Sequence, residues 1–186
     1  MPVRRRLLIA LLASPGGLAA AAARAQTTPP AAPPELAGEL AGARWRGSAV
    51  LRWLGLHIYD AQLWTTAPPA ADPLGHPSAL ALVYGRKLVG AQIASRSIDE
   101  MRRIGPFSDA QAERWLQAMT RLFPDVQAGD RLTGVHLPGR AARFFFNGQH
   151  RGDVADPEFA RLFFGIWLSP RSSEPRLREQ LLGGAP

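Results

Sequence analysis

The feature that most constrains the fold lies late in the chain, where Asn147 and Gly148 divide the stretch ARFFFNGQHRGDV, residues 142–154. Asparagine and glycine both tolerate a positive φ angle, which the two central residues of a tight hairpin turn require. Such a pair between apolar runs is the strongest short-range signal for a β-hairpin. The sequence therefore predicts antiparallel strands on either side of Asn147 and Gly148.

Three earlier stretches also have the composition of strands. Residues 44–66 contain β-branched and aromatic residues in rough alternation, which predicts one or two strands with Gly47 and Gly55 as sites of a bend or bulge. Residues 79–86 and 130–137 alternate in the same way, as expected for strands with one buried face.

Helical patterns are confined to two places in the chain, between the early and late strands and after the hairpin. The predicted helices cover 89–103, 108–123, 156–169 and a short segment that follows Ser173 as its cap. The second helix has a capping box and the third begins with Asp-Pro, both typical of helix starts. Because strands and helices are segregated, the sequence predicts an α+β fold with a mainly antiparallel sheet.

The first 25 residues have the pattern of a secretory signal peptide. Three arginines precede an apolar run, and Ala23-Arg24-Ala25 forms a small-x-small cleavage site. Residues 26–39 are rich in Pro and Ala and are expected to be a leader, followed by one folded domain over 40–184. The expected location is periplasmic, with no transmembrane anchor after cleavage; the alternative is an uncleaved membrane anchor.

Composition argues against several classes of function. The chain has 22 basic and 15 acidic residues, but four of the arginines lie in the segment 1–25, so the remaining charge is modest and does not predict nucleic-acid binding. There is no cysteine, and the four histidines are scattered without the spacing of a metal site. We therefore expect no metal, no cofactor and no disulfide, and a fold held by its apolar core.

Six segments, taken in order, resemble the bacterial chalcone isomerase-like proteins. They are GSAVLRWLGLHIYDAQLW, ALALVYGRKLVG, MRRIG, FPDVQAGDRLTG, FFFNGQHRGDVADPEFARLFFGIWLS and PRLREQLLG. The resemblance spans about residues 40–183. It implies an open-faced β-sandwich, a large antiparallel sheet with helices packed on one face. This agrees with the segregated order of strands and helices.

The resemblance does not carry over the plant isomerase site. In the plant enzymes a Thr on the second strand and a Tyr and an Asn on the following helix hold the phenolate substrate. At the corresponding positions this chain has Tyr59, Ile93 and Glu100, and residues 85–146 contain no Tyr or Asn. The phenol-amide pair is therefore absent.

The non-enzymatic branch of the same fold implies a different site. Its fatty-acid-binding members hold a carboxylate with an early-strand Arg and a Tyr, which correspond here to Arg52 and Tyr59. An Arg offers a forked, always charged donor set and a Tyr adds one hydroxyl donor. The two positions are an odd number of residues apart, so their convergence requires a bulge or a turn; Arg46 is the substitute if it fails.

The expected function is therefore non-catalytic binding of a small amphipathic ligand such as a fatty acid. The nearly all-apolar helix 156–169 would cover the sheet as core and in addition wall a pocket with its Phe and Trp side chains. One alternative is an isomerase or intramolecular lyase that uses His57 or Tyr59 as acid or base. Another is a module that binds a second envelope protein through exposed aromatic side chains.

Overall fold

The structure, a computed structural model, describes residues 29–68 and 72–184. Six strands form one sheet in which sequence neighbours are also spatial neighbours, and every pairing is antiparallel. The strands are β1 (Arg44–Trp53), β2 (Leu56–Thr65), β3 (Ser78–Tyr84), β4 (Arg131–Leu137), β5 (Ala141–Phe146) and β6 (Gln149–Val154). The expected α+β class with an antiparallel sheet is confirmed.

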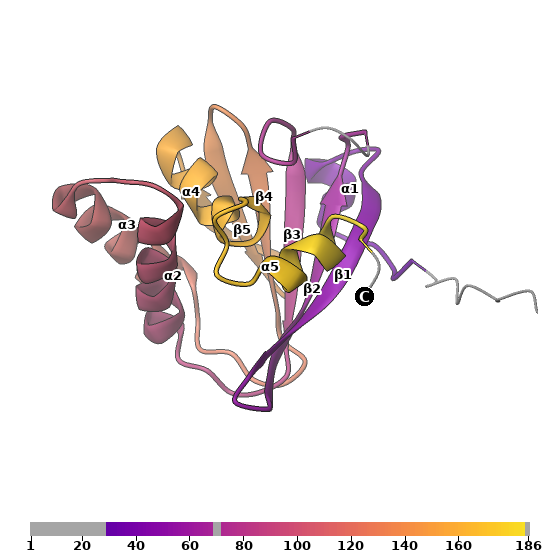
Figure 1. Cartoon of the computed structure of the whole chain (residues 1–186), viewed down its shortest axis with the longest axis horizontal. Coiled ribbons are helices and arrows are strands. Elements are labelled where there is room, and N and C mark those ends of the chain that lie inside the picture. The colour runs from indigo at the N-terminus through magenta and orange to yellow at the C-terminus, as the bar shows by residue number, and fades with distance from the viewer. Residues whose placement is uncertain (1–28, 69–71, 185–186) are drawn as a thin grey trace, which may run out of the picture.

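Helices cover one face of this sheet, and a single short helix lies against the other (Figure 1). The helices are α1 (Leu36–Glu39), α2 (Gly90–Ile104), α3 (Asp109–Leu122), α4 (Pro157–Leu168) and α5 (Pro175–Leu181). The chain inserts α2 and α3 between β3 and β4, and it ends with α4 and α5. No helix among residues 29–68 and 72–184 is long and apolar enough to cross a membrane, and the expected signal peptide, 1–25, lies outside the described residues.

The predicted β5–β6 hairpin is confirmed. Asn147 and Gly148 have φ angles of 48° and 85°, and Phe146 pairs with Gln149 across the turn. The first long stretch forms two strands, β1 and β2, joined by the two-residue turn Leu54-Gly55. Gly47 lies at a register shift in β1, as expected for a bulge site.

Helix starts also follow the sequence signals, with one exception. Ser108 and Gln111 form the capping box of α3, and Asp156 accepts hydrogen bonds from the first backbone amides of α4. The predicted cap of α5 is wrong: Ser173 makes no cap, and the side chain of Ser172 instead accepts from the amide of Glu174 at 3.2 Å.

Aromatic side chains make up the centre of the core on the helix-covered face. Phe163 of α4 contacts five other rings: Phe159, Phe164 and Trp167 of its own helix, Phe144 of β5, and Phe123 after α3. Such rings bury large areas, and the tilted, edge-on and stacked arrangements seen here are among those that aromatic pairs favour. Eight of the twelve residues of α4 are buried. The helix α4, which we expected to form part of the core and to line a pocket, thus packs on the sheet.

The opposite face of the sheet carries a smaller apolar cluster and several ion pairs. Leu36 of α1 is buried there against Trp64 and Val135. The almost fully buried carboxylate of Glu35 accepts hydrogen bonds from Arg131 at 3.0 Å and from Thr133 at 2.6 Å. Residues 35–39, expected to belong to a leader, are therefore packed on the sheet, because their apolar and acidic side chains find partners on this face.

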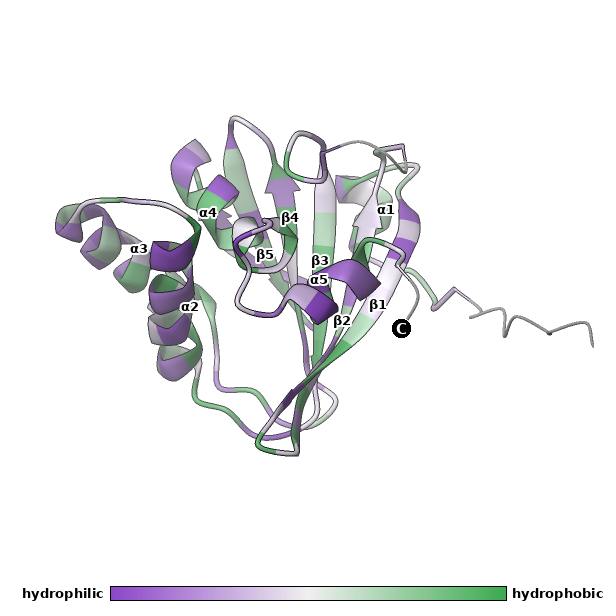
Figure 2. Cartoon of the chain, viewed as in Figure 1, coloured by the Kyte–Doolittle hydropathy of each residue, from purple (hydrophilic) through white to green (hydrophobic). Residues whose placement is uncertain are grey.

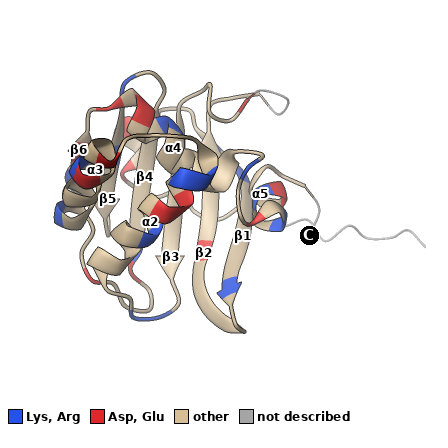
Figure 3. Ribbon diagram, turned by 60° about the vertical axis from the view of Figure 1, so that its left-hand side comes forward, with Lys and Arg blue, Asp and Glu red and all other residues tan. Residues whose placement is uncertain are grey.

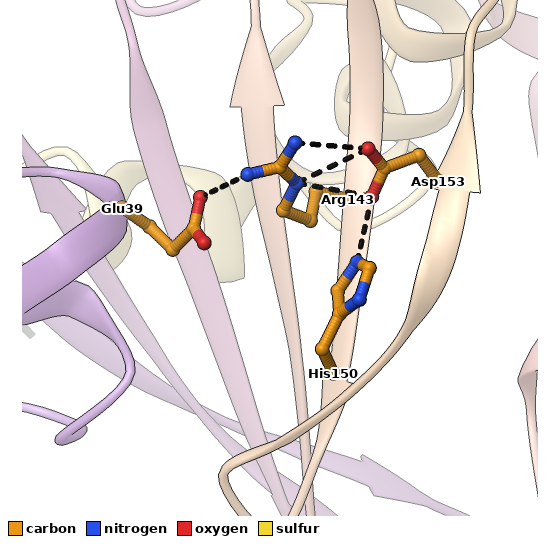
Figure 4. Close-up of polar contacts among 4 residues, drawn as sticks. All are labelled: Glu39, Arg143, His150 and Asp153. Carbon is orange, nitrogen blue, oxygen red and sulfur yellow. Dashed lines mark hydrogen bonds and ion pairs between the residues drawn. The ribbon is translucent and has the colours of Figure 1, made fainter.

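A second set of ion pairs fastens the end of α1 to the sheet (Figure 4). Arg143 binds Glu39 at 2.6 Å on one side and Asp153 at 3.0 Å on the other, and His150 lies 2.8 Å from Asp153. Burial alone would raise the pKa of Asp153, but hydrogen bonds from Arg143 and His150 lower it.

Candidate ligand-binding site

A cavity of about 430 Å³ lies between the sheet and its helical cover. Its floor comes from β1 to β4, and its walls come from α2, α4 and α5 together with the residues just before α5. Figure 1 shows that α2 and α5 stand apart over the same face of the sheet. The volume is within the range of sites for small molecules.

Most of the cavity surface is apolar. Leu51, Leu82, Phe163, Ile166 and Trp167 are among the side chains that line it. The helix α4 therefore serves both purposes expected of it, because Phe159 and Phe164 are fully buried in the core while neighbouring positions face the cavity. An apolar enclosure of this kind binds hydrocarbon through removal of apolar surface from water.

Tyr59 of β2 lies on the cavity wall, as the resemblance implied for a ligand residue. Its hydroxyl oxygen accepts a hydrogen bond from Trp167 Nε1 at 3.0 Å, and its ring meets Tyr84 edge-on. Burial raises the pKa of both phenols far above their usual value, so both stay protonated. Because Tyr59 accepts from Trp167, its own O–H can donate to a molecule in the cavity.

The side of the cavity formed by α2 is polar. Gln92, Arg96, Ser97 and Glu100 all line it. Glu100 is only 8% exposed and lies 2.6 Å from the guanidinium of Arg96 and 3.6 Å from that of Arg103, whereas Arg96 itself is 67% exposed. Arg96 is thus an arginine that reaches both the cavity and the solvent.

Arg52 is exposed and is not among the described residues that line the cavity. Its neighbours Leu51 and Trp53 do line it, and strand alternation therefore directs Arg52 toward the other face of the sheet. The register places Leu51 opposite Tyr59 and Arg52 opposite His57, with a bulge between the two pairs. The turn at Gly55 brings the two strands together, but it does not bring Arg52 and Tyr59 together on the cavity wall.

Two other residues singled out from the sequence also lie away from the cavity lining. The Nε of Arg46 donates to the carbonyl oxygen of Leu182 at 2.9 Å, which ties β1 to the end of the chain. His57 lies 3.2 Å from Asp60 and packs over Gly85, where a Cβ would overlap with the imidazole ring. Sequence reasoning did not select Arg96 as a cavity residue. It considered Glu100 as the residue that replaces the Asn of the plant enzymes, and the structure buries Glu100 on the side of α2 that lines the cavity.

A family model described as "Chalcone isomerase-like" matches residues 40–183, most of the chain. The chain belongs to the chalcone isomerase-like family. A protein of Haemophilus influenzae described as uncharacterised is 30% identical over 143 residues, which are 76% of this chain and 69% of that protein.

The fold is also found in a solved structure. The fatty-acid binding protein AtFAP1 of Arabidopsis thaliana superposes with a TM-score of 0.61 at 16% sequence identity, covering 75% of this chain and 86% of the plant protein. At that identity the likeness establishes the shared architecture. The chalcone isomerase-like fold predicted from the sequence is therefore confirmed.

Proposed function

We propose that this chalcone isomerase-like protein binds a small amphipathic molecule, a fatty acid being the first candidate, without converting it. The observation that carries the proposal is the cavity itself: a largely apolar enclosure with two neutral phenols, Tyr59 and Tyr84, and the guanidinium of Arg96 on its wall. A hydrocarbon tail would occupy the apolar part, and a polar head would meet the donors. The fatty-acid binding recorded for AtFAP1 supports this choice of ligand.

The proposal also names the arginine that would bind the ligand carboxylate. The family resemblance points to Arg52, and the geometry supports Arg96, since Arg96 lines the cavity and Arg52 does not. A guanidinium binds carboxylates through paired hydrogen bonds. To bind a ligand carboxylate, Arg96 must share or exchange its contact with Glu100.

The test compares alanine variants of these arginines by calorimetry with dodecanoate. If Arg96 holds the carboxylate, Arg96→Ala should weaken binding by about 1.5–3 kcal/mol, the range for a hydrogen bond to a charged group, or about ten- to a hundredfold. Arg52→Ala should have little effect. Arg103→Ala is the matched control, because Arg103 lies on the same helix and faces the same Glu100 from outside the cavity lining.

Two further measurements separate charge from shape. Dodecanol has the same tail without the charge, so its affinity should not depend on Arg96. Glu100→Gln should strengthen dodecanoate binding, because it removes the carboxylate that competes for Arg96.

A large loss of dodecanoate affinity in Arg52→Ala, with no loss in Arg96→Ala, would identify Arg52 on the early strand as the residue that binds the carboxylate. Failure of the wild type to bind either probe would overturn the proposed function, and chemical conversion of a bound ligand would favour the isomerase or lyase alternative.

Tyr59→Phe provides a separate prediction about the neutral donor. Removing one hydroxyl should weaken dodecanoate binding by about 1 kcal/mol. The free energy of unfolding should also fall by about 1–3 kcal/mol, because the buried indole N–H of Trp167 loses its acceptor. Tyr84→Phe is the control, since Tyr84 lines the same cavity; equal effects of the two variants on binding would argue against a specific contact with Tyr59.

A further inference from the structure

The large apolar side chains that remain exposed gather at one end of the molecule. Among residues 29–68 and 72–184 they are Val50, Trp53, Leu54, Leu56 and Val89. Four of them belong to the β1–β2 hairpin, and Val89 lies in the neighbouring connection from β3 to α2. Figure 2 shows hydrophobic colour along the hairpin where it projects beyond the helices. We call these five residues the apolar tip.

Leu54 at the turn of this hairpin is the strongest sign that the apolar tip has a purpose. Its side chain is 80% exposed and its φ angle is +50°. A position of this kind favours Asn, Asp or Gly, and any other residue there pays a cost in backbone energy. Leucine at this site gains no stability from burial within the chain. The turn therefore exposes an apolar side chain at a position where the backbone conformation favours Asn, Asp or Gly.

Cations surround the apolar tip. Arg52, Arg86 and Lys87 are exposed, and none of them has an ion-pair partner among the described residues. Figure 3 shows basic residues on the lower part of β1 and on the connection below β3.

The carboxylates at this end are engaged within the chain. Asp60 lies beside His57, Asp125 accepts from the amide of Gly90, and Asp130 accepts from the amide of Gln127. The surface that this end of the molecule presents outward is therefore apolar at its centre and positive at its edge.

This end of the molecule also adjoins the cavity. Trp53 is 64% exposed and at the same time lines the cavity, as does Leu88 between Lys87 and Val89. A surface that covered the apolar tip would therefore also cover this side of the cavity.

We propose that the apolar tip inserts into the interfacial region of a lipid bilayer that contains anionic lipids, with Arg52, Arg86 and Lys87 at the headgroups. Tryptophan favours this interface, and each basic residue close to an anionic membrane adds to the attraction. The projecting, narrow shape of the hairpin end suits insertion between lipids better than docking on a flat protein surface. Because Trp53 is exposed and also lines the cavity, docking would place this side of the cavity at the lipid surface.

The experiment measures binding of the full chain to vesicles of phosphatidylcholine alone and of phosphatidylglycerol mixed with phosphatidylcholine, by co-sedimentation. Leu54→Asn places a preferred residue in the turn, so the fold should be retained while binding falls about tenfold, the scale for burial of a leucine side chain. Arg86→Glu should lower binding to the anionic vesicles by about fivefold or more. Arg140→Glu, an equal charge change at the β4–β5 turn, is the matched control.

All variants keep the same N-terminal segment, so any difference between them reports the substituted site. Preference for anionic vesicles, weakened by Leu54→Asn and Arg86→Glu but not by Arg140→Glu, is the expected result. Equal binding by all four proteins would overturn the proposal, as would binding that does not depend on lipid charge. Saturable binding to a purified protein that Leu54→Asn abolishes, without vesicle binding, would assign the tip to a protein partner instead. The result is independent of the dodecanoate assay, so each proposal can fail alone.

Discussion

Replacing Phe163 by alanine is expected to lower the free energy of unfolding by about 3–5 kcal/mol, the cost of removing a large buried aromatic side chain. Phe163 is 5% exposed and packs against Phe144 and Phe159 at ring-centre distances of 5.3 and 5.4 Å. One side of its ring already faces the cavity, so the enlarged space joins an existing void and we expect a cost toward the lower end of this range.

Chemical denaturation of the wild type and of Phe163→Ala would measure this loss. The matched control is Phe107→Ala: Phe107 is half-buried in the α2–α3 connection and has Trp115 and the guanidinium of Arg102 for neighbours. We expect Phe107→Ala to lower the free energy of unfolding by clearly less than Phe163→Ala does. Equal losses in the two variants would mean that the aromatic cluster around Phe163 does not form the energetic centre of the core.

Acid is expected to destabilise the protein through His136. This histidine of β4 is almost completely buried against Phe164, and burial lowers its pKa to about 4. The unfolded chain takes up this proton near pH 6.5 and the folded chain does so only near pH 4. Stability is therefore fully present above about pH 6.5 and is lost as the pH falls toward 4, by about 3 kcal/mol in total from this group.

The measurement is the free energy of unfolding of the wild type and of His136→Leu between neutral pH and pH 4. Leucine removes the titrating group and the buried Nδ1, which has no hydrogen-bond partner. The free energy of unfolding of His136→Leu should therefore change less steeply with pH than that of the wild type. His76→Gln, a substitution at a half-buried histidine two residues before β3, should keep the wild-type slope. An unchanged slope in His136→Leu would show that other groups govern acid unfolding.

The sequence predicted the elements of the fold well because their signals are local. The turn at Asn147-Gly148, the capping box at Ser108 and the Asp-Pro start of α4 each depend on a few adjacent residues. The packed position of Glu35 was missed because its partners, Arg131 and Thr133, are about a hundred residues away and give no local signal.

The candidate site was less predictable, for two physical reasons. The face on which Arg52 lies depends on the position of one bulge, and a shift of one residue exchanges the two faces of a strand. The cavity draws its lining from strands and helices that are far apart in the sequence, and no periodicity within a single helix records such an arrangement. Glu100, for example, is buried beside the cavity, although its neighbours in the sequence include several charged residues.

The consecutive order of the strands has a consequence for how the chain reaches its folded state. Five pairings build the sheet, and four of them join strands separated by no more than a short connection. Such contacts form quickly because little chain entropy is lost in closing them. The pairing of β3 with β4 is different, since α2 and α3 lie between these strands. Closure of this long loop is the expected slow event in folding, and because the cavity draws its lining from both sides of the β3–β4 junction, a binding-competent cavity would form only once this closure is complete.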